Sequence, residues 1–414
     1  MDILYNGFDF LMNGLMKITA AIPYRAPARP VLQDTGKFNT NYPYIFGSGF
    51  WSWGQYKKGY GSLPYWGFFT GENFVSSMNE SGLSAAAADV SPLGSAWDRA
   101  CELYAQLTGT VVDYGRAHSE KYHHTRYGED YTGKALITNW SEKNKINIIC
   151  HSFGGPTSAL FASILEYGCD EEKAVTTDGS LSPFFEGGKG DLIYSITGVA
   201  GAYNGTSLIV NEQALNDTLK ALQKRLPLWK ADPLYHTAEK LVEFFAPLLD
   251  GDTPSPDTGL YDMVPDNSVE LNKKIKTVPN IYYFTIPCCT TKEDVKRNVQ
   301  VPDFKITDYF FALIADIMGK TDTVTPGGII LGKEWQPNDG LVNTISETGP
   351  FNEEKTYLKC SPSKSVIQKN LAKGRYYVFE TLNGSHNTLS GGTVRPCRYA
   401  KEYIFKLVEM INSL

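Results

Sequence analysis

The residues most suited to covalent chemistry are Cys150-His151-Ser152-Phe153-Gly154. A short apolar run starting at Ile146 precedes them, and apolar residues at helical spacing follow Gly155, so a strand is expected to end in a sharp turn into a helix. A serine on such a turn presents its hydroxyl above the sheet, and the first helical amides face whatever the hydroxyl attacks. The pattern predicts a nucleophile elbow at Ser152.

The elbow departs from the usual Gly-x-Ser-x-Gly pattern at Cys150. The strand and helix backbones nearly touch at such a turn, so the residues two before and two after the serine must be small. Cysteine is small enough for this position. The alternative is an ordinary turn, because a small-x-Ser-x-Gly string often occurs by chance.

A nucleophilic serine requires a base, because its hydroxyl is weak until an imidazole takes its proton. Where an elbow serine works with an acid and a histidine, the acid and then the histidine follow it along the chain. Two histidines follow Ser152, namely His236 and His386. His236 lies in a helical insertion, whereas His386 follows the last expected strand, so His386 is favoured.

The acid is expected between the serine and the histidine, on a loop near the strand ends. Asp339 in Asn338-Asp339-Gly340 is the best candidate, and Asp294, in a loop after the strand at Ile281, is the competitor. An Asp-Gly pair is also a common plain turn, so spacing alone leaves both interpretations of Asp339 open.

A glycine-rich loop, residues 47–54, follows the first expected central strand. Beside an elbow serine, such a loop can supply a backbone amide to an oxyanion hole. The alternative is an ordinary strand-to-helix turn that happens to be rich in Gly and Trp.

Three of the six histidines lie within residues 117–126. His118 and His124 do not have the spacing of one helix face, so they would have to meet across a turn. With one or two aspartates from elsewhere they could form a closed zinc site, which would be structural because four protein ligands leave no position for water. The alternative is a solvated polar loop.

The overall composition excludes several classes of protein. A net charge of -6 gives no basic footprint for nucleic acid. Seven cysteines without a C-x-x-C pair indicate neither a disulfide framework nor a zinc ribbon. No apolar stretch is long enough to cross a bilayer. The N-terminus lacks the basic start of a secretory signal, so either the protein is not exported by that route or the numbering begins after a removed signal.

The expected elements alternate between strand and helix, which is typical of a mostly parallel α/β sheet. Residues 1–41 suggest an apolar helix followed by an extended arm. A helix is expected over 97–107 with Ser95 as its cap, and residues 206–249 are expected to be largely helical. The central strands are expected near 42–46, 85–90, 146–150, 191–199, 281–286 and 376–379.

From about Tyr42 to the C-terminus the chain resembles the large bacterial lipases of the thermophilic bacillus and staphylococcal group. The blocks that carry the resemblance are Ser95-Ala96-Trp97-Asp98-Arg99-Ala100-Cys101-Glu102, Thr110-Val111-Val112-Asp113-Tyr114-Gly115, Leu181-Ser182-Pro183-Phe184-Phe185-Glu186-Gly187-Gly188 and Asn338-Asp339-Gly340-Leu341-Val342-Asn343-Thr344. The resemblance implies an α/β-hydrolase fold with a mostly parallel central sheet, a helical lid insertion and a small zinc-binding subdomain. Residues 1–41 would be an N-terminal extension and 42–414 the lipase domain, with the lid at about 206–249.

Carried over residue by residue, the resemblance assigns the site as follows. The triad would be Ser152, Asp339 and His386, the oxyanion amides those of Phe50 and Phe153, and the zinc ligands Asp98, His118, His124 and Asp257.

The chain departs from the family pattern at three places. The residue after the nucleophile is often Gln and is Phe153 here, but the backbone amide makes the contact, so catalysis need not suffer. The oxyanion loop of the family usually reads His-Gly-Phe, and Ser48 replaces the histidine. The family's calcium site uses acids just after the catalytic histidine, where this chain has Asn387, Thr388, Gly392 and Thr393, so no calcium is expected.

The function implied is a lipase or carboxylesterase that hydrolyses acylglycerol-type lipid esters at a lipid-water interface through an acyl-enzyme. The resemblance also implies an extracellular location. Two alternatives stand beside it: a zinc-dependent hydrolase with an open coordination position at the four-ligand site, and an inactive lipid-binding protein on the same scaffold.

Overall fold

The computed structural model describes residues 38–57, 60–61, 63–68, 70, 72–211, 255–307, 309–392 and 400–414. Nearly all of the expected N-terminal extension and most of the expected lid therefore lie outside the described residues. His236 lies outside them as well.

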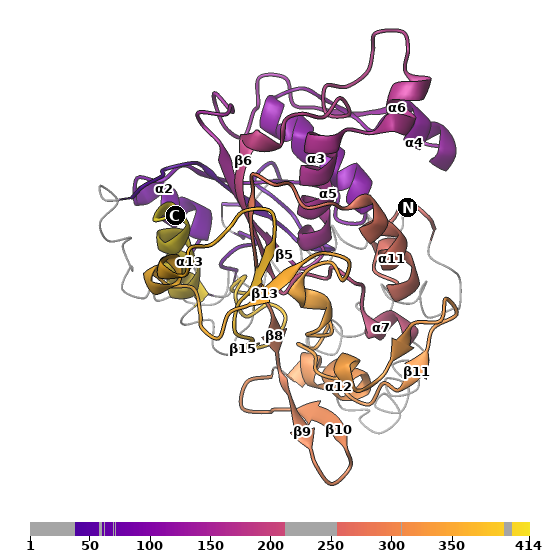
Figure 1. The fold of residues 1–414 in the computed structure, drawn as a ribbon, viewed down its shortest axis with the longest axis vertical. Helices are drawn as coiled ribbons and strands as arrows, with labels where there is room; N and C mark the ends of the chain where they lie inside the picture. Colours follow the sequence, from indigo (N-terminus) through magenta and orange to yellow (C-terminus); the bar gives the residue numbers. More distant parts are fainter. Residues whose placement is uncertain are drawn as a thin grey trace.

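A seven-stranded sheet forms the centre of the molecule (Figure 1), and each strand pairs with its neighbours in parallel. This confirms the expected mostly parallel α/β sheet. In sheet order the strands are β13 (Lys355–Tyr357), β14 (Tyr376–Val378), β7 (Tyr282–Ile286), β6 (Ile193–Val199), β5 (Ile146–His151), β1 (Tyr44–Gly47) and β2 (Ala85–Ala87).

In the part of the chain that the structure describes, four two-stranded ladders lie outside this sheet. They pair β3 (Val111–Asp113) with β4 (Tyr127–Asp130), β9 (Thr291–Asp294) with β10 (Val299–Pro302), β11 (Thr323–Val324) with β12 (Ile330–Leu331), and β8 (Cys288–Cys289) with β15 (Leu382–Asn383). The β9–β10 hairpin projects from the lower end of the molecule in Figure 1.

The helices surround the sheet. The α-helices are α2 (Phe74–Glu80), α3 (Ala96–Thr108), α4 (Arg116–Tyr122), α5 (Gly154–Tyr167), α6 (Asp170–Val175), α7 (Ser207–Val210), α10 (Gly259–Asp262), α11 (Pro265–Lys274), α12 (Tyr309–Met318) and α13 (Ala400–Asn412). Short 3-10 turns are η2 (Gly190–Leu192), η4 (Lys333–Trp335), η5 (Ser346–Thr348) and η6 (Lys364–Lys369). No helix in these ranges is long and apolar enough to cross a bilayer.

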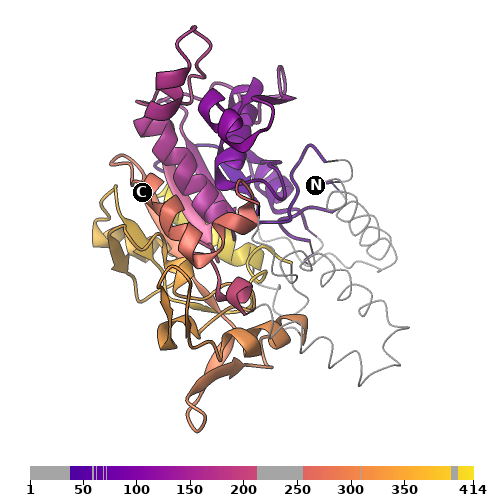
Figure 2. The same ribbon diagram turned by 90° about the vertical axis from the view of Figure 1, so that its right-hand side faces the viewer.

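Two apolar layers pack on opposite faces of the sheet. Successive strand residues point to opposite faces, so Ile45 joins the layer formed with α3, α5 and α11, whereas Tyr44 and Phe46 join the layer formed with α2 and α13. In Figure 2, α5 and α11 lie in front of the sheet and α13 lies behind it. β5 is buried along its whole length, as expected for a central parallel strand.

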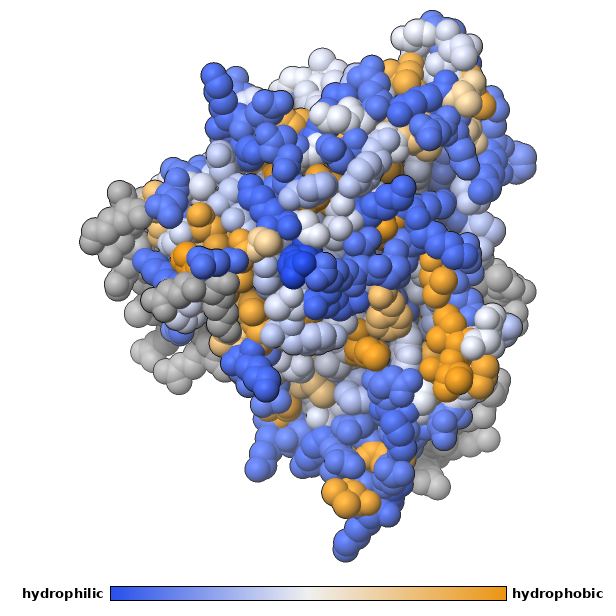
Figure 3. Space-filling model, viewed as in Figure 1, coloured by the Kyte–Doolittle hydropathy of each residue, from blue (hydrophilic) through white to orange (hydrophobic). Residues whose placement is uncertain are grey.

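The outer surface in Figure 3 is mostly hydrophilic, and its hydrophobic residues form several separate areas. Among the described residues, Val295 and Ile330 are strongly exposed at 78% and 65%, and they belong to the β9–β10 and β11–β12 hairpins.

The structure confirms the expected start of α3. Ser95 is its N-cap, and the Ser95 hydroxyl accepts a hydrogen bond from the Asp98 amide. The strand expected over 85–90 is shorter and ends at Ala87. β13 and α13 were not expected. β13 has three residues at the edge of the sheet and gives almost no periodic signal. The apolar residues of α13 do recur at helical spacing, and this helix was missed.

Candidate active site and metal site

Ser152 stands at the junction of β5 and α5. Its φ of 57° lies in the left-handed region, which a side chain normally avoids. The backbone holds this conformation, because the Ser152 amide donates to Val199 O at 3.0 Å and Ser152 O accepts from Gly155 and Ala202 at 2.9 and 3.1 Å. A strained serine fixed in this way is the geometry expected of a nucleophile elbow.

Small residues are required around this turn, as the sequence suggested. A Cβ on Gly154 would lie 2.7 Å from Ser48 O. A Cβ on Gly47 would lie 3.1 Å from the Cβ of Cys150, so a glycine on the neighbouring strand leaves room for the cysteine side chain. Cys150 is therefore accommodated at the first position of the pattern.

Asp339 and His386 form a buried pair. His386 Nδ1 lies 2.5 Å from Asp339 Oδ2. The other oxygen, Asp339 Oδ1, accepts from the amides of Leu341 and Val342 at 2.9 and 2.8 Å. Burial alone would raise the pKa of Asp339, but the charge of His386 and these hydrogen bonds hold that pKa below its ordinary value. Asp339 is thus a carboxylate that accepts the Nδ1 proton, which leaves His386 Nε2 as a base.

Ser152 is linked to His386 through its neighbour His151. No hydrogen bond joins the Ser152 hydroxyl to His386 within the described part of the chain. Instead, His151 Nε2 lies 2.9 Å from His386 O, and the two imidazole rings are 4.7 Å apart. In enzymes without substrate the hydrogen bond between the serine and the histidine is often long or absent. Its absence here therefore does not rule out a catalytic role for Ser152 and His386.

His151 also connects to the glycine-rich loop through Tyr65. A carbonyl can only accept, so His151 Nε2 carries the proton and Nδ1 accepts from the Tyr65 hydroxyl at 2.6 Å. The Gly49 amide in turn donates to Tyr65 Oη at 3.1 Å. Burial, followed by the charge of His386, lowers the pKa of His151 to about 3, and burial raises the pKa of Tyr65 to about 12. Both groups are therefore neutral at physiological pH.

The loop Ser48-Gly49-Phe50 lies directly against the serine. A Cβ on Gly49 would lie 3.2 Å from the Ser152 hydroxyl oxygen. The rings of Phe50 and Phe153 both approach Gly259, where a Cβ would lie 3.0 and 2.8 Å from them. Phe50 and Phe153 are the residues expected to supply the oxyanion amides. One comes about a hundred residues before Ser152 and the other directly after it, and their rings lie near one another in the fold.

The four residues expected to bind metal converge on one point. Asp98, His118, His124 and Asp257 each offer one ligand atom, and these atoms lie within 4.8 Å of one another. His118 Nε2 is 3.1 Å from Asp98 Oδ1 and 3.0 Å from Asp257 Oδ1, and His124 Nε2 is 3.4 Å from Asp257 Oδ2. The solvated-loop alternative does not describe this arrangement.

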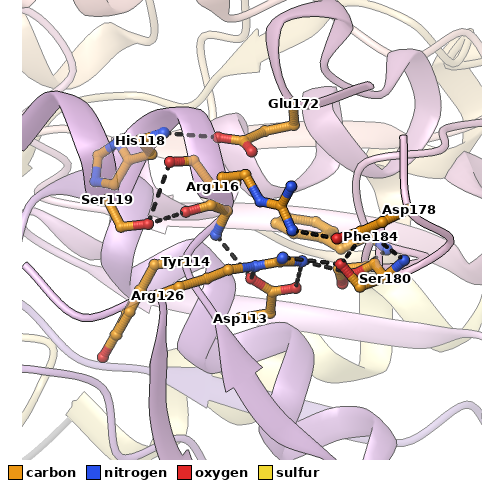
Figure 4. Close-up of polar contacts among 12 residues, drawn as sticks. Asp113, Tyr114, Arg116, His118, Ser119, Arg126, Glu172, Asp178, Ser180 and Phe184 are labelled. Atoms are coloured by element: carbon orange, nitrogen blue, oxygen red, sulfur yellow. Dashed lines mark hydrogen bonds and ion pairs between the residues drawn. The ribbon is translucent and has the colours of Figure 1, made fainter. Parts of the chain in front are cut away.

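The local backbone explains how the two histidines meet. His123 ends α4 in a left-handed conformation with φ 59°, which turns the chain so that His124 faces back toward His118. The Glu172 carboxylate accepts from the amides of Ala117 and His118 at 3.0 and 2.8 Å and so caps α4 (Figure 4).

A second charged pair fixes the segment after these histidines. Arg126 donates to both carboxylate oxygens of Asp113 at 2.8 and 2.7 Å and to Ser180 O at 2.6 Å (Figure 4). The bidentate pair fixes Arg126 against β3, and the bond to Ser180 O joins Arg126 to the loop after α6.

The donor set fits a divalent metal such as zinc. His124 Nδ1 lies 2.8 Å from Thr125 O and must donate to it, so Nε2 is the ring nitrogen left to bind a metal. That Nε2 is buried and makes no hydrogen bond. A buried nitrogen lone pair beside two carboxylates is costly unless a cation satisfies it. Two imidazoles and two carboxylates match the ligand types of a closed tetrahedral zinc site.

The competing acid does not reach the site. Asp294 lies in β9, where it accepts from Arg297 Nε at 2.7 Å and from the amides of Lys296 and Arg297. The contributions of Tyr65 and Arg99 could not be found from sequence patterns, because both lie far from Ser152 in the chain and reach the site only through the fold. His151 directly precedes Ser152, but no pattern showed its contacts with Tyr65 and His386.

The fold and the serine turn together are those of the α/β-hydrolase class. A family model described as "Lipase-like, C-terminal domain" matches residues 40–226 and 252–378, and the chain belongs to this family. A lipase of Staphylococcus epidermidis is 31% identical over 331 residues, which cover 73% of this chain and 44% of that protein. Lipase 1 of Staphylococcus aureus is 31% identical over 323 residues, covering 73% and 45%. The chain spans less than half the length of these curated relatives.

Solved structures of two bacterial proteins are similar to this chain over nearly its whole length. EstA from Clostridium botulinum superimposes with a TM-score of 0.74 at 27% identity, covering 97% of both chains. Staphylococcus hyicus lipase gives 0.69 at 27% identity, covering 94% of this chain and 97% of that one.

Proposed function

We propose that this protein is a carboxylic ester hydrolase that acts on acylglycerol-type lipid esters through an acyl-enzyme. The observation that carries the proposal is the strained Ser152 at the head of α5, in a site that also holds the buried Asp339-His386 pair. Membership of a lipase-like family supports the substrate class.

In the proposed reaction His386 Nε2 takes the proton of Ser152 as the hydroxyl oxygen attacks the ester carbonyl. Asp339 holds the imidazole in the required tautomer and stabilises the imidazolium that forms. The imidazolium then protonates the departing alcohol, which leaves an acyl-serine. Water, activated by the same histidine, releases the fatty acid and restores the serine.

The negative charge on the acyl oxygen is stabilised by the amides of Phe50 and Phe153. Two amides preorganised beside the nucleophile stabilise this charge without the reorganisation that water would need. The lack of a side chain at Gly49 brings the loop backbone close enough to Ser152 for this role.

The metal has a structural role in this proposal. Zinc held by Asp98, His118, His124 and Asp257 would cross-link the start of α3, the start of α4 with the residues that follow it, and the segment before α10. The alternative of a zinc-dependent hydrolase needs an open coordination position, whereas four protein ligands around one zinc would leave no such position.

The remaining assignments rest on the sequence. An amphipathic segment over 206–249 would cover an apolar cleft in water and move aside at a lipid surface. Residues 42–414 would form the hydrolase domain with 1–41 as an extension, and the enzyme would act outside the cell.

Hydrolysis of p-nitrophenyl esters from short to long acyl chains, with and without an emulsion, tests the function. We expect turnover by the wild-type protein and its loss in Ser152→Ala with an unchanged circular dichroism spectrum and melting temperature. Turnover that survives in Ser152→Ala would refute the assignment.

A further inference from the structure

Arg99 is a buried cation that contacts the candidate oxyanion loop, Ser48-Gly49-Phe50, and residues next to it. It is fully buried on α3. Its Nη2 donates to Ser48 O at 2.6 Å, and its Nη1 donates to Gly49 O at 2.8 Å and approaches Ser91 O at 3.3 Å.

No carboxylate of the described residues forms a direct ion pair with Arg99. The acid whose charge acts most on Arg99 is the buried Glu102, one turn further along α3. Its carboxylate accepts from the Ser91 amide and the Tyr114 hydroxyl instead of from the guanidinium. Burying a guanidinium without such a contact carries a desolvation penalty. Its other neighbour is the ring of Phe153, whose centroid lies 5.2 Å from the guanidinium carbon. A buried guanidinium that donates to loop carbonyls and lies against this ring, and that donates to no carboxylate, is better explained by positioning than by stability.

The contacts of Arg99 orient two successive peptide units. In a planar trans peptide the C=O and N–H point in opposite directions, and the described chain has no cis peptide. The Ser48–Gly49 peptide is held at both ends, because its carbonyl accepts from Arg99 and its amide donates to Tyr65 Oη. In the Gly49–Phe50 peptide the carbonyl accepts from Arg99, with the Ser52 hydroxyl 2.5 Å away, so the Phe50 N–H points to the other side.

We propose that Arg99 is the positioning residue of the oxyanion hole: its guanidinium fixes the Ser48-Gly49-Phe50 backbone, which aims the Phe50 amide, and its contact with the Phe153 ring holds the second donor residue. The proposal rests on the proposed ester hydrolysis. It also explains how the loop keeps its shape with Ser48 in place of the expected histidine, because Arg99 holds carbonyls, which any residue provides.

The test compares Arg99→Met with wild type in hydrolysis of p-nitrophenyl butyrate and in inhibition by butylboronic acid. The boronate forms a tetrahedral serine adduct whose oxygen occupies the oxyanion position. We expect kcat/KM to fall about 100-fold, the range seen when one oxyanion donor is lost, with KM changed less than about threefold. The inhibition constant of the boronate should rise by the same factor as kcat/KM falls.

Arg126→Met is the matched control, because Arg126 is also a largely buried arginine that donates to a backbone carbonyl, Ser180 O. It should lower the melting temperature without changing kcat or boronate affinity. Arg99→Lys keeps the charge but offers one nitrogen, so an intermediate fall of about tenfold is expected.

Wild-type kcat and boronate affinity in folded Arg99→Met would overturn the proposal while leaving the ester hydrolase intact. A wild-type protein that neither turns over esters nor binds the boronate would instead refute the function itself. If Arg99→Met fails to fold, Arg99→Lys carries the test. A fall in its kcat with a matching loss of boronate affinity supports the positioning role, and wild-type values of both overturn it.

Discussion

Gly49 and Ser152 lie so close that a Cβ on Gly49 would come within 2.7 Å of the Ser152 Cβ. No real Cβ tolerates this distance to a fixed side chain, and Ser152 is fixed by its strained backbone. The loop after β1 can therefore pack against the nucleophile turn only because residue 49 has no side chain.

Gly49→Ala should therefore displace the loop from the serine and lower kcat/KM for a short p-nitrophenyl ester by about 100-fold or more, as expected when an oxyanion donor is misplaced. Gly61→Ala is the control, since a Cβ there meets no atom within 4 Å. Equal activity of the two variants would argue against an oxyanion role for this loop.

Asp339→Asn should lower kcat about 10⁴-fold, because an amide in this place favours the wrong histidine tautomer. Asp294→Asn, at the competing acid, should leave kcat at the wild-type value, because Asp294 contacts Arg297 in an outlying hairpin. Steady-state kinetics of both variants decide between the two acids. A large loss in Asp294→Asn with an active Asp339→Asn would reverse the assignment.

Removing the metal should lower the thermal stability of the protein before it affects ester hydrolysis. We expect about one zinc per chain, and we expect chelation to lower the melting temperature by about 5–10 °C while ester hydrolysis persists at temperatures where the protein stays folded. His124→Ala should lose the metal, whereas His123→Asn should keep it, because asparagine also tolerates the left-handed conformation of His123. Elemental analysis and thermal melts measure both effects. Turnover that stops in chelated, fully folded protein would favour a catalytic metal.

His151 should make the fold sensitive to acid. Its pKa falls from 6.5 to about 3 on folding, mainly through burial. The unfolded chain then binds a proton more readily than the native one, so stability is lost as the pH drops from 6.5 toward 3, by about 2 kcal/mol at pH 5. His151→Gln retains a donor for His386 O and an acceptor for Tyr65 but does not titrate. Urea unfolding at pH 8 and pH 5 should show a smaller loss in the variant, and an equal loss would contradict the burial of a neutral His151.

Short sequence patterns, such as a helix cap or a run of apolar residues, were enough to predict several elements. The Ser95 cap of α3, the buried run of β5 and the sharp turn after it are set by neighbours in sequence. The order of Ser152, Asp339 and His386 was also readable, and the structure brings the last two into contact.

Contacts between distant segments were not predictable in the same way. From the sequence, Arg99 would be placed on the surface of a helix. No neighbouring residue shows that it donates to the carbonyls of Ser48 and Gly49, in the loop after the first strand. Asp257 itself has a left-handed backbone with a φ of 74°, a conformation that no residue pattern indicated. The short edge strand β13 exists only because β14 offers it a partner.

The most direct test of the central claim is labelling with a fluorophosphonate, followed by mass mapping of the adduct. The hydrolase account predicts one adduct per chain on the peptide that contains Ser152, absent in Ser152→Ala and strongly slowed in Asp339→Asn. A folded wild-type protein that takes no label, or carries it on another residue, would contradict the account.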